Sequence, residues 1–187
     1  MVIDIGGGTT DIAILSMGEI VASKSLRYAG DRMNQAIVNY IKANHQLLIG
    51  MRTAEAIKIE IGTATDPDPD ASMNVRGRDT IDGLPKQIKV NSSEVTEALQ
   101  EGLQSIIDTT KQVLQETPPE LSADIIDRGI MITGGGALLK NIDKLIADSL
   151  QVPVLIAESP LESVALGTGI LLQHIETGVA FERYYLG

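Results

Sequence analysis

The sequence predicts an α/β fold, and three features of the chain lead to this prediction. Short strand-like runs open the chain, helical periodicity follows from about residue 31, and an all-apolar strand at 130–132 leads into a glycine-rich loop. A strand, a loop, a helix and a further strand in that order form a right-handed βαβ unit by default. At 187 residues, the chain can bury a substantial core as one large or two small domains.

The N-terminal segment predicts an antiparallel β layer. Its strands are expected at residues 2–5, 11–16 and 20–26, with turns at 6–10 and 17–19 that contain glycine. Such a meander brings the ends of neighbouring strands together at each turn.

The segment after this layer predicts a smaller α+β unit. Apolar residues recur at helical spacing from Asp31, the expected N-cap, to Leu48, and a second helix over 54–61 has Thr53 as its expected cap. An acidic turn with two prolines follows at 66–70. Short strands are then expected at residues 73–78 and 87–90.

The rest of the chain predicts helices around further strands. After Ser92-Ser93, a long amphipathic helix runs to about Glu116 and buries a stripe that includes Gly102. The later elements are a short helix at 121–127, a two-sided buried strand at 130–132, a helix at 137–150, a buried strand at 152–156 and a last helix at 163–177. Gly167 and Gly169 are expected to permit close packing of that last helix.

Composition excludes several classes of function. A formal net charge of −10 argues against nonspecific binding to nucleic acid or to an anionic membrane. The absence of cysteine excludes disulfides and thiolate metal sites and fits a reducing cytoplasm. No apolar run is long enough for a transmembrane segment, and aromatic residues for stacking on nucleic acid are scarce. We therefore expect a cytoplasmic protein with no nucleic-acid partner.

The turn Gly6-Gly7-Gly8-Thr9 predicts a phosphate-binding loop. Glycine can adopt positive φ and lets several N–H donors face one anion, and the Thr9 hydroxyl adds a donor. Asp4 and Asp11 flank this turn at strand ends, and carboxylates repel phosphate unless a cation lies between them. A hydrated Mg²⁺ held by Asp4 or Asp11 is therefore expected. The alternative is a hairpin turn without any ligand, although three glycines exceed what such a turn requires.

A second loop of the same type points to a nucleotide. Gly134, Gly135 and Gly136 follow the strand at 130–132 and lead through Ala137 and Leu138 into the next helix. Two phosphate-type loops in one chain favour a ligand that both contact.

Four segments together resemble the actin, sugar-kinase and heat-shock ATPase superfamily, and most closely the MreB family of bacterial actin-like proteins. They are the turn from Asp4 to Asp11, the Gly30-Asp31 step, the run 52–62 and the loop 133–139. The glycine loops alone indicate only the superfamily, whereas the run 52–62 is more specific. The resemblance covers essentially the whole chain in order.

The resemblance implies a role for each candidate residue. Gly6, Gly7, Gly8 and Thr9 would form the second phosphate loop, with Asp4 and Asp11 near the metal. Gly30 and Asp31 would belong to the nucleotide site, Glu55 and Lys58 would reach the ribose and adenine, and Gly134 to Leu138 would form the adenosine loop. From the residues alone, Glu55 and Lys58 read as a solvated helical ion pair.

The resemblance also implies an architecture and a function. A ribonuclease H-like actin-fold subdomain, IIA-like, would comprise 1–30 and 97–187, and a smaller inserted α+β subdomain, IIB-like, would comprise 31–96. The chain would be the C-terminal half of an ATP-binding cytoskeletal filament protein that maintains rod cell shape by organising cell-wall synthesis.

The first phosphate loop and a catalytic glutamate are expected in a preceding domain, so no catalytic residue is assigned here. ATP and Mg²⁺ would be the cofactors of the family's ATPase activity, and this chain alone would bind ATP weakly and be inactive. Self-association into filaments and contacts with membrane-anchored cell-shape proteins are the expected interactions. The alternatives are a sugar kinase or polyphosphate hydrolase of the same superfamily and a truncated interaction module.

Overall fold

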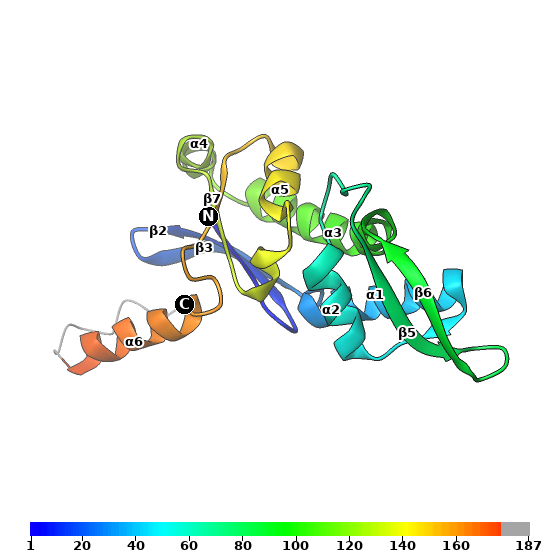
Figure 1. Ribbon diagram of the computed structural model, residues 1–187. Helices are drawn as coiled ribbons and strands as arrows, with labels where there is room; N and C mark the ends of the chain where they lie inside the picture. Colours follow the sequence, from blue (N-terminus) through cyan, green and yellow to red (C-terminus); the bar gives the residue numbers. More distant parts are fainter. Residues whose placement is uncertain (177–187) are drawn as a thin grey trace.

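The computed structural model describes residues 1–176 and contains two β-sheets with helices packed around them (Figure 1). The larger sheet has the strand order β3-β2-β1-β7-β8. Its strands are β1 (Val2–Ile5), β2 (Thr10–Ser16), β3 (Glu19–Leu26), β7 (Ile130–Thr133) and β8 (Val154–Ile156). Strands β1 to β3 are antiparallel, whereas β7 and β8 run parallel to β1. The predicted α/β class is confirmed.

The smaller sheet belongs to the unit predicted between the β layer and the long helix. Its antiparallel strands are β4 (Leu47–Leu48), β5 (Ser72–Asp79) and β6 (Pro85–Asn91). The helices α1 (Gly30–His45) and α2 (Met51–Ile61) pack beside it at the end of the molecule opposite α6 in Figure 1. The inserted α+β arrangement is confirmed.

Helix α3 joins the two parts of the molecule. It spans Ser92–Gln115 and packs against β2 and β3 of the larger sheet and against α1, α2 and β6 of the smaller unit. The remaining helices are α4 (Pro119–Arg128), the 3₁₀-helix η1 (Gly135–Leu138), α5 (Ile142–Leu150) and α6 (Ser163–Glu176). The division predicted at residues 96 and 97 lies inside α3 and stays a prediction.

One contiguous apolar core extends through both parts. Isoleucines of the larger sheet, apolar residues of α1 and one stripe of α3 contribute its largest fully buried side chains. These include Ile3, Ile5, Ile12, Met33, Ile37, Ile41, Leu99, Leu103 and Ile106. Helix α3 therefore buries the stripe that its sequence predicts, and the two parts share one core.

Several helix starts differ from their predictions, and among α1, α2 and α3 a side chain caps α3 alone. Helix α1 has Ala29, not Asp31, as its N-cap, and α2 has Gly50 rather than Thr53. Helix α3 begins at Ser92 through a capping box, in which the Asn91 side chain accepts from the Glu94 amide while the Glu94 carboxylate accepts from the Asn91 amide.

Two predicted helices are also shorter in the structure. Helix α1 ends where Gln46 adopts a left-handed conformation, and Leu48 therefore lies in β4. The helix predicted over 137–150 is interrupted: η1 ends at Leu138, and α5 begins only at Ile142. Asn141 has a left-handed conformation between them, which a continuous α-helix cannot contain.

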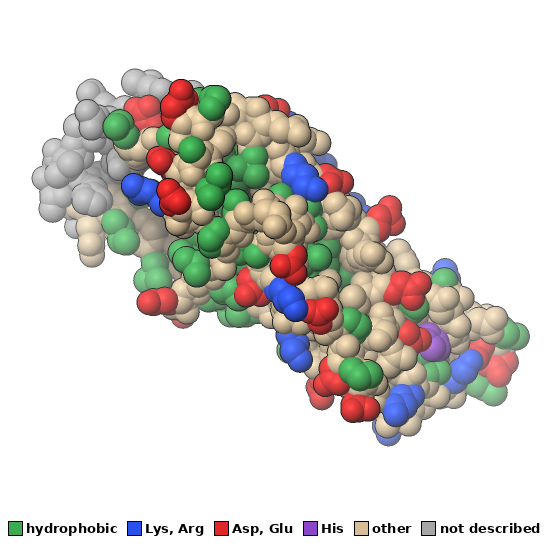
Figure 2. Space-filling model, turned by 90° about the horizontal axis from the view of Figure 1, so that it is seen from above, with side chains coloured by type: hydrophobic (Ala, Val, Ile, Leu, Met, Phe, Trp, Pro, Cys, Tyr) green, Lys and Arg blue, Asp and Glu red, His purple; other side chains and the backbone are tan. Residues whose placement is uncertain are grey.

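The C-terminal elements are less buried than their apolar sequences predict. Met131 in β7 is 38% exposed, and Leu155 in β8 is 55% exposed, so two-sided burial of these strands is wrong. Among the described residues, no atom lies within 4 Å of a Cβ built on Gly167 or Gly169, so close helix packing at these glycines is also wrong. Thr177, the predicted end of the last helix, lies outside the described residues. The face in Figure 2 shows apolar side chains gathered over the half of the molecule that contains these C-terminal elements.

Within residues 1–176, no helix is both long and apolar enough to cross a bilayer.

Gly102 in α3 faces the ring of Tyr28, which follows β3. A Cβ atom built on Gly102 would overlap two carbons of that ring and the hydroxyl oxygen. The Tyr28 hydroxyl is buried without a hydrogen-bond partner, and burial together with Glu101 raises the pKa of Tyr28 to about 12. The ring therefore fills the space that the missing side chain leaves.

Gly102→Ala is expected to destabilise the protein even though alanine is the better helix former. The usual gain of roughly 0.5–1 kcal/mol from replacing a helical glycine is outweighed by the overlap with Tyr28, and a net loss of about 1–3 kcal/mol is expected. Urea denaturation measures it. In a double-mutant cycle with Tyr28→Ala, the two losses should be clearly less than additive. A stabilised G102A variant would contradict this packing.

Candidate functional site

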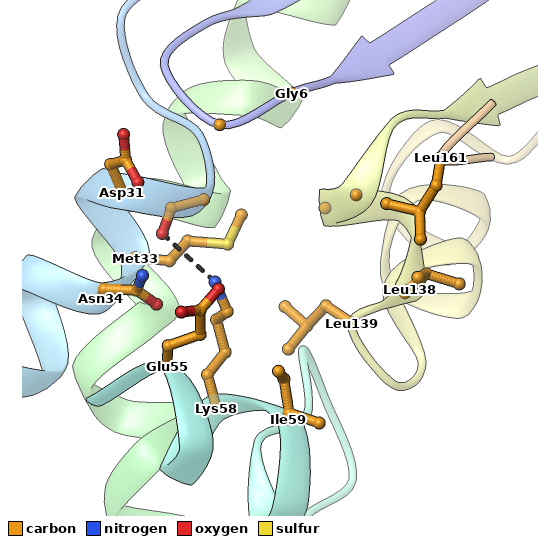
Figure 3. A pocket seen from close by; sticks show the side chains of 14 residues that line it. Gly6, Asp31, Met33, Asn34, Glu55, Lys58, Ile59, Leu138, Leu139 and Leu161 are labelled. Atoms are coloured by element: carbon orange, nitrogen blue, oxygen red, sulfur yellow. Dashed lines mark hydrogen bonds between the residues drawn. The ribbon is translucent and has the colours of Figure 1, made fainter. Parts of the chain in front are cut away.

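A cavity of about 510 Å³ lies between the two predicted glycine loops. Four separate segments line it: the first glycine turn, the start of α1, helix α2 and the region of η1. Figure 3 shows Asp31, Asn34, Glu55 and Lys58 on one side and Leu138, Leu139 and Leu161 on the other. The cavity therefore has one polar wall and one apolar wall, with the first glycine turn at one end.

Backbone hydrogen bonds fix the first glycine turn to the start of α1. The Gly30 amide donates to the Gly6 carbonyl at 3.0 Å, and the Asp31 amide donates to the Gly7 carbonyl at 2.8 Å. These carbonyls satisfy N–H groups that a side-chain cap would otherwise serve, which explains why α1 begins without one. The turn and the helix thus form one rigid edge of the cavity.

The first glycine turn keeps free donors on its exposed side. No residue from Gly6 to Gly8 has a positive φ, so the positive φ predicted for this turn is wrong. Instead, a Cβ at Gly7 or Gly8 would meet no atom within 4 Å, and both residues are exposed. Their amides donate to no other residue of the described chain. Open space above unpaired N–H groups is what a bound anion requires.

Helix α2 supplies the charged part of the polar wall. Glu55 and Lys58 both line the cavity, and the Lys58 ammonium group donates to the Gly30 carbonyl at 3.3 Å. Burial lowers the pKa of Lys58, while Glu55 and Asp31 oppose this shift. Lys58 therefore connects α2 to the edge formed by the glycine turn and α1.

The second glycine loop approaches β1 closely. Gly134 has φ of 81°, and a Cβ there would overlap the Ile5 carbonyl and the Asp4 carboxylate. A Cβ at Gly136 would overlap the Ile5 side chain. The loop can lie against β1 only because both residues lack a side chain.

Only part of this second loop offers free amides. The Gly134 amide donates to the Pro160 carbonyl at 3.0 Å, and the Ala137 amide donates to the Gly134 carbonyl at 3.1 Å. The amides of Gly135 and Gly136 donate to no other residue within 1–176, and both residues line the cavity. These two N–H groups are therefore the donors that η1 presents to a ligand.

Asp4 and Asp11 lie opposite each other on the antiparallel strands β1 and β2. Burial, and then the charge of Asp11, raises the pKa of Asp4. The Thr9 hydroxyl donates to the Asp11 carboxylate at 3.0 Å, and neither aspartate forms an ion pair with a described residue. Two adjacent, uncompensated carboxylates fit a divalent cation.

A cluster of bonds between residues 63–66 and 140–144, here called the clasp, holds the smaller unit to the loop after η1. Thr63 and Lys140 form a parallel β-bridge, and the Ala64 amide donates to the Lys140 carbonyl at 2.8 Å. The Asn141 side chain donates to the Thr63 hydroxyl and to the Thr65 carbonyl, at 3.1 and 3.0 Å. Lys144 forms an ion pair with Asp66.

The structure brings most, but not all, of the predicted residues to the cavity. Those that line it are Gly6, Gly7, Gly30, Asp31, Glu55, Lys58, Gly135, Gly136 and Leu138. Six others do not line it: Asp4, Gly8, Thr9, Asp11, Gly134 and Ala137, of which Ala137 is fully buried. The lining residues that the sequence analysis missed are Met33, Asn34, Ile59, Leu139 and Leu161.

Comparisons with known proteins agree on one family. The family model described as MreB/Mbl protein matches residues 1–179. The chain is 56% identical over 176 residues to the cell shape-determining protein Mbl of Bacillus subtilis (strain 168), covering 94% of this chain and 53% of that protein. It is 47% identical to the cell shape-determining protein MreB of Escherichia coli (strain K12), covering 94% of this chain and 51% of that protein.

Solved structures give the same result for the fold. The chain resembles MreB5 of Spiroplasma citri, a crystal structure bound to ADP, with a TM-score of 0.91, 42% identity, and coverage of 95% of this chain and 54% of that one. A MamK double helical filament gives a TM-score of 0.68 at 23% identity, with coverage of 86% and 50%, which supports the fold alone. The chain spans about half the length of these relatives.

Gly134→Ala is expected to lower the free energy of unfolding by at least about 2 kcal/mol, because it adds an unfavourable positive φ to an overlap with β1. Gly7→Ala is the matched control: its Cβ enters open space, and a change within about 0.5 kcal/mol is expected. Thermal and urea denaturation of both variants would measure the difference. Equal losses in the two variants would refute this account of the loop.

Asp4→Asn is expected to raise the melting temperature at pH 7. The pKa of Asp4 is higher in the folded state than in the unfolded state, so ionisation disfavours folding; this penalty is complete above the folded pKa and disappears as the pH falls below the unfolded one. The gain in D4N should therefore shrink on acidification. Asp124→Asn, on the exposed surface of α4, serves as the control and should show no such pH-dependent gain. A lower melting temperature for D4N at pH 7 would contradict the prediction.

Proposed function

The chain belongs to the MreB/Mbl family, and we propose that it forms the part of an actin-like ATP-binding protein that holds the adenosine and one side of the triphosphate. The observation that carries this proposal is the convergence of two distant glycine loops on one cavity. Gly6 and Gly7 lie at one edge, Gly135 and Gly136 lie at another, and Glu55 and Lys58 face the space between them.

The two walls of the cavity suit the different parts of a nucleotide. The unpaired amides of Gly7 and Gly8 can donate to phosphate oxygens, whereas the predicted donor Thr9 already donates its hydroxyl proton to Asp11. Leu138, Leu139 and Leu161 offer an apolar surface for a flat base (Figure 3). Glu55 and Lys58 can then exchange hydrogen bonds with the sugar. Nucleotide binding also agrees with the ADP and AMPPNP complexes of MreB5 from Spiroplasma citri.

Asp4 and Asp11 would hold Mg²⁺ beside the glycine turn. Among residues 1–176, no group of three or more His, Cys, Asp or Glu side chains forms a metal site, so these two aspartates supply at most two protein ligands. Mg²⁺ commonly binds one or two carboxylates and completes its shell with water and phosphate oxygens. When bound, it would offset the charge of both carboxylates and of the phosphates.

At the level of the whole protein, we infer a filament-forming ATPase that determines cell shape. The relatives Mbl and MreB are named as cell shape-determining proteins, and the resemblance to actin-like proteins adds filament formation. Self-association, a cytoplasmic location and attachment to the membrane through anchored partners are parts of this proposal. Identity of about half to the cell-shape proteins favours this function over a sugar kinase or polyphosphate hydrolase.

We expect the isolated chain to bind Mg-ATP weakly, with a dissociation constant of about 0.1–1 mM, and to hydrolyse it negligibly. The described residues contribute one glycine turn to the phosphates, and no catalytic carboxylate is assigned among them. Lys58→Met should weaken binding about tenfold, or about 1.4 kcal/mol, because it removes the cation from the polar wall.

Titration by NMR chemical shifts, or by calorimetry at high protein concentration, would measure both affinities. Lys89→Met, at an exposed position of β6, is the matched control and should bind Mg-ATP like the unmodified chain. No binding at millimolar ATP would overturn the proposed function, and equal affinities for K58M and K89M would remove Lys58 from the site.

A further inference from the structure

Asn34 faces the cavity from α1 and is 5% exposed. It lies one helical turn after Gly30, so both residues are on the side of α1 that faces α2 and the glycine turn. Figure 3 shows its side chain pointing from α1 towards Glu55 and Lys58. An asparagine at a buried helical position needs hydrogen-bond partners for its carboxamide.

The Oδ1 atom of Asn34 has no such partner. It is buried, and no described residue donates to it. The other buried side-chain atom without a partner in the described chain is the Tyr28 hydroxyl, which lies under α3 and outside the cavity lining. Asn34 is thus the orphaned buried acceptor that borders the ligand space, and a donor from a ligand would satisfy it.

The surrounding groups restrict which part of a nucleotide supplies that donor. The Lys58 ammonium group donates to the Gly30 carbonyl and not to Asn34 Oδ1, and Glu55 offers only acceptors when ionised. The amides that suit phosphates lie at the glycine turn, and the leucines that suit a base lie on the opposite wall. The polar wall that contains Asn34 is therefore left to face the sugar.

We propose that Asn34 Oδ1 accepts a hydrogen bond from a ribose hydroxyl of the bound nucleotide and thereby selects ribonucleotides over deoxyribonucleotides. This inference rests on the proposed nucleotide function and names a specificity-determining residue within that site. A buried acceptor discriminates strongly against an analogue that lacks the matching donor, because the acceptor is then left unpaired in the complex.

The test compares the affinity of the whole chain for ATP, 2′-deoxy-ATP, 3′-deoxy-ATP and the triphosphate of purine riboside, which lacks the amino group of adenine. The unmodified chain should bind one of the two deoxy analogues about five- to tenfold more weakly than ATP. In Asn34→Leu, which removes the acceptor, this ratio should fall below about twofold. In Asn34→Asp, which retains an acceptor oxygen, the ratio should persist even if both affinities decrease.

Asn39→Ala is the control on the same helix, since Asn39 is exposed and its side chain accepts a hydrogen bond from Gln35 of the same helix. Its ratios should equal those of the unmodified chain. Equal affinities of the unmodified chain for ATP and both deoxy analogues would overturn the inference while leaving the proposed function intact. The inference would also fail if N34L changed only the ratio of the affinities for ATP and purine riboside triphosphate. The donor to Asn34 would then be the adenine amino group.

Two further results distinguish the inference from its alternatives. If N34L is more stable than the unmodified chain and binds all four nucleotides with unchanged ratios, Asn34 is an unpaired core group without a ligand role. If the unmodified chain binds none of the nucleotides, both the inference and the proposed function fail.

Discussion

The clasp between residues 63–66 and 140–144 sets the position of one cavity wall relative to the other. Helix α2, which presents Glu55 and Lys58, ends two residues before Thr63, and η1, which presents Gly135 and Gly136, ends two residues before Lys140. The bridge therefore fixes the two walls close to the residues that face the ligand. Thr63 is 2% exposed and lies between the Lys140 backbone, Asn141 and Thr96, so the contact is buried as well as hydrogen-bonded. Shared core packing along α3 supports the same arrangement from behind.

Close backbone approach is the second requirement of the site. Gly134 and Gly136 let the second loop lie directly on β1, and β1 leads into the first glycine turn. Both loops are thus positioned by one strand, β1, in the middle of the larger sheet. A rigid scaffold can hold the N–H donors of such loops in place before any ligand binds. The carbonyls of Gly6 and Gly7 extend this frame to α1, because they accept from its first amides.

The sequence predicted the parts of the site that local chemistry determines. Glycine turns between apolar strands can be recognised without knowing their neighbours, whereas Glu55 and Lys58 were assigned to the site only through the family resemblance. Leu161 could not be predicted, since it reaches the cavity through the bond between the Gly134 amide and the Pro160 carbonyl, 26 residues away in the chain. The cap of α1 was mispredicted for a similar reason, because its partners are carbonyls of another segment. Asn34 and Met33 did carry a signal, since helical spacing from Gly30 puts them on the same face.

Charge explains how an acidic chain could accommodate a polyanion. A formal net charge of −10 gives no general attraction for phosphate, so binding must depend on local donors. The glycine amides supply partial positive charge, but Asp4 and Asp11 lie at the base of the same turn and would repel phosphate oxygens. In the proposed function, a divalent cation held by the two aspartates would offset this repulsion. In the proposed function, the cation and the nucleotide should therefore strengthen each other's binding by the same factor, as linkage between two sites requires.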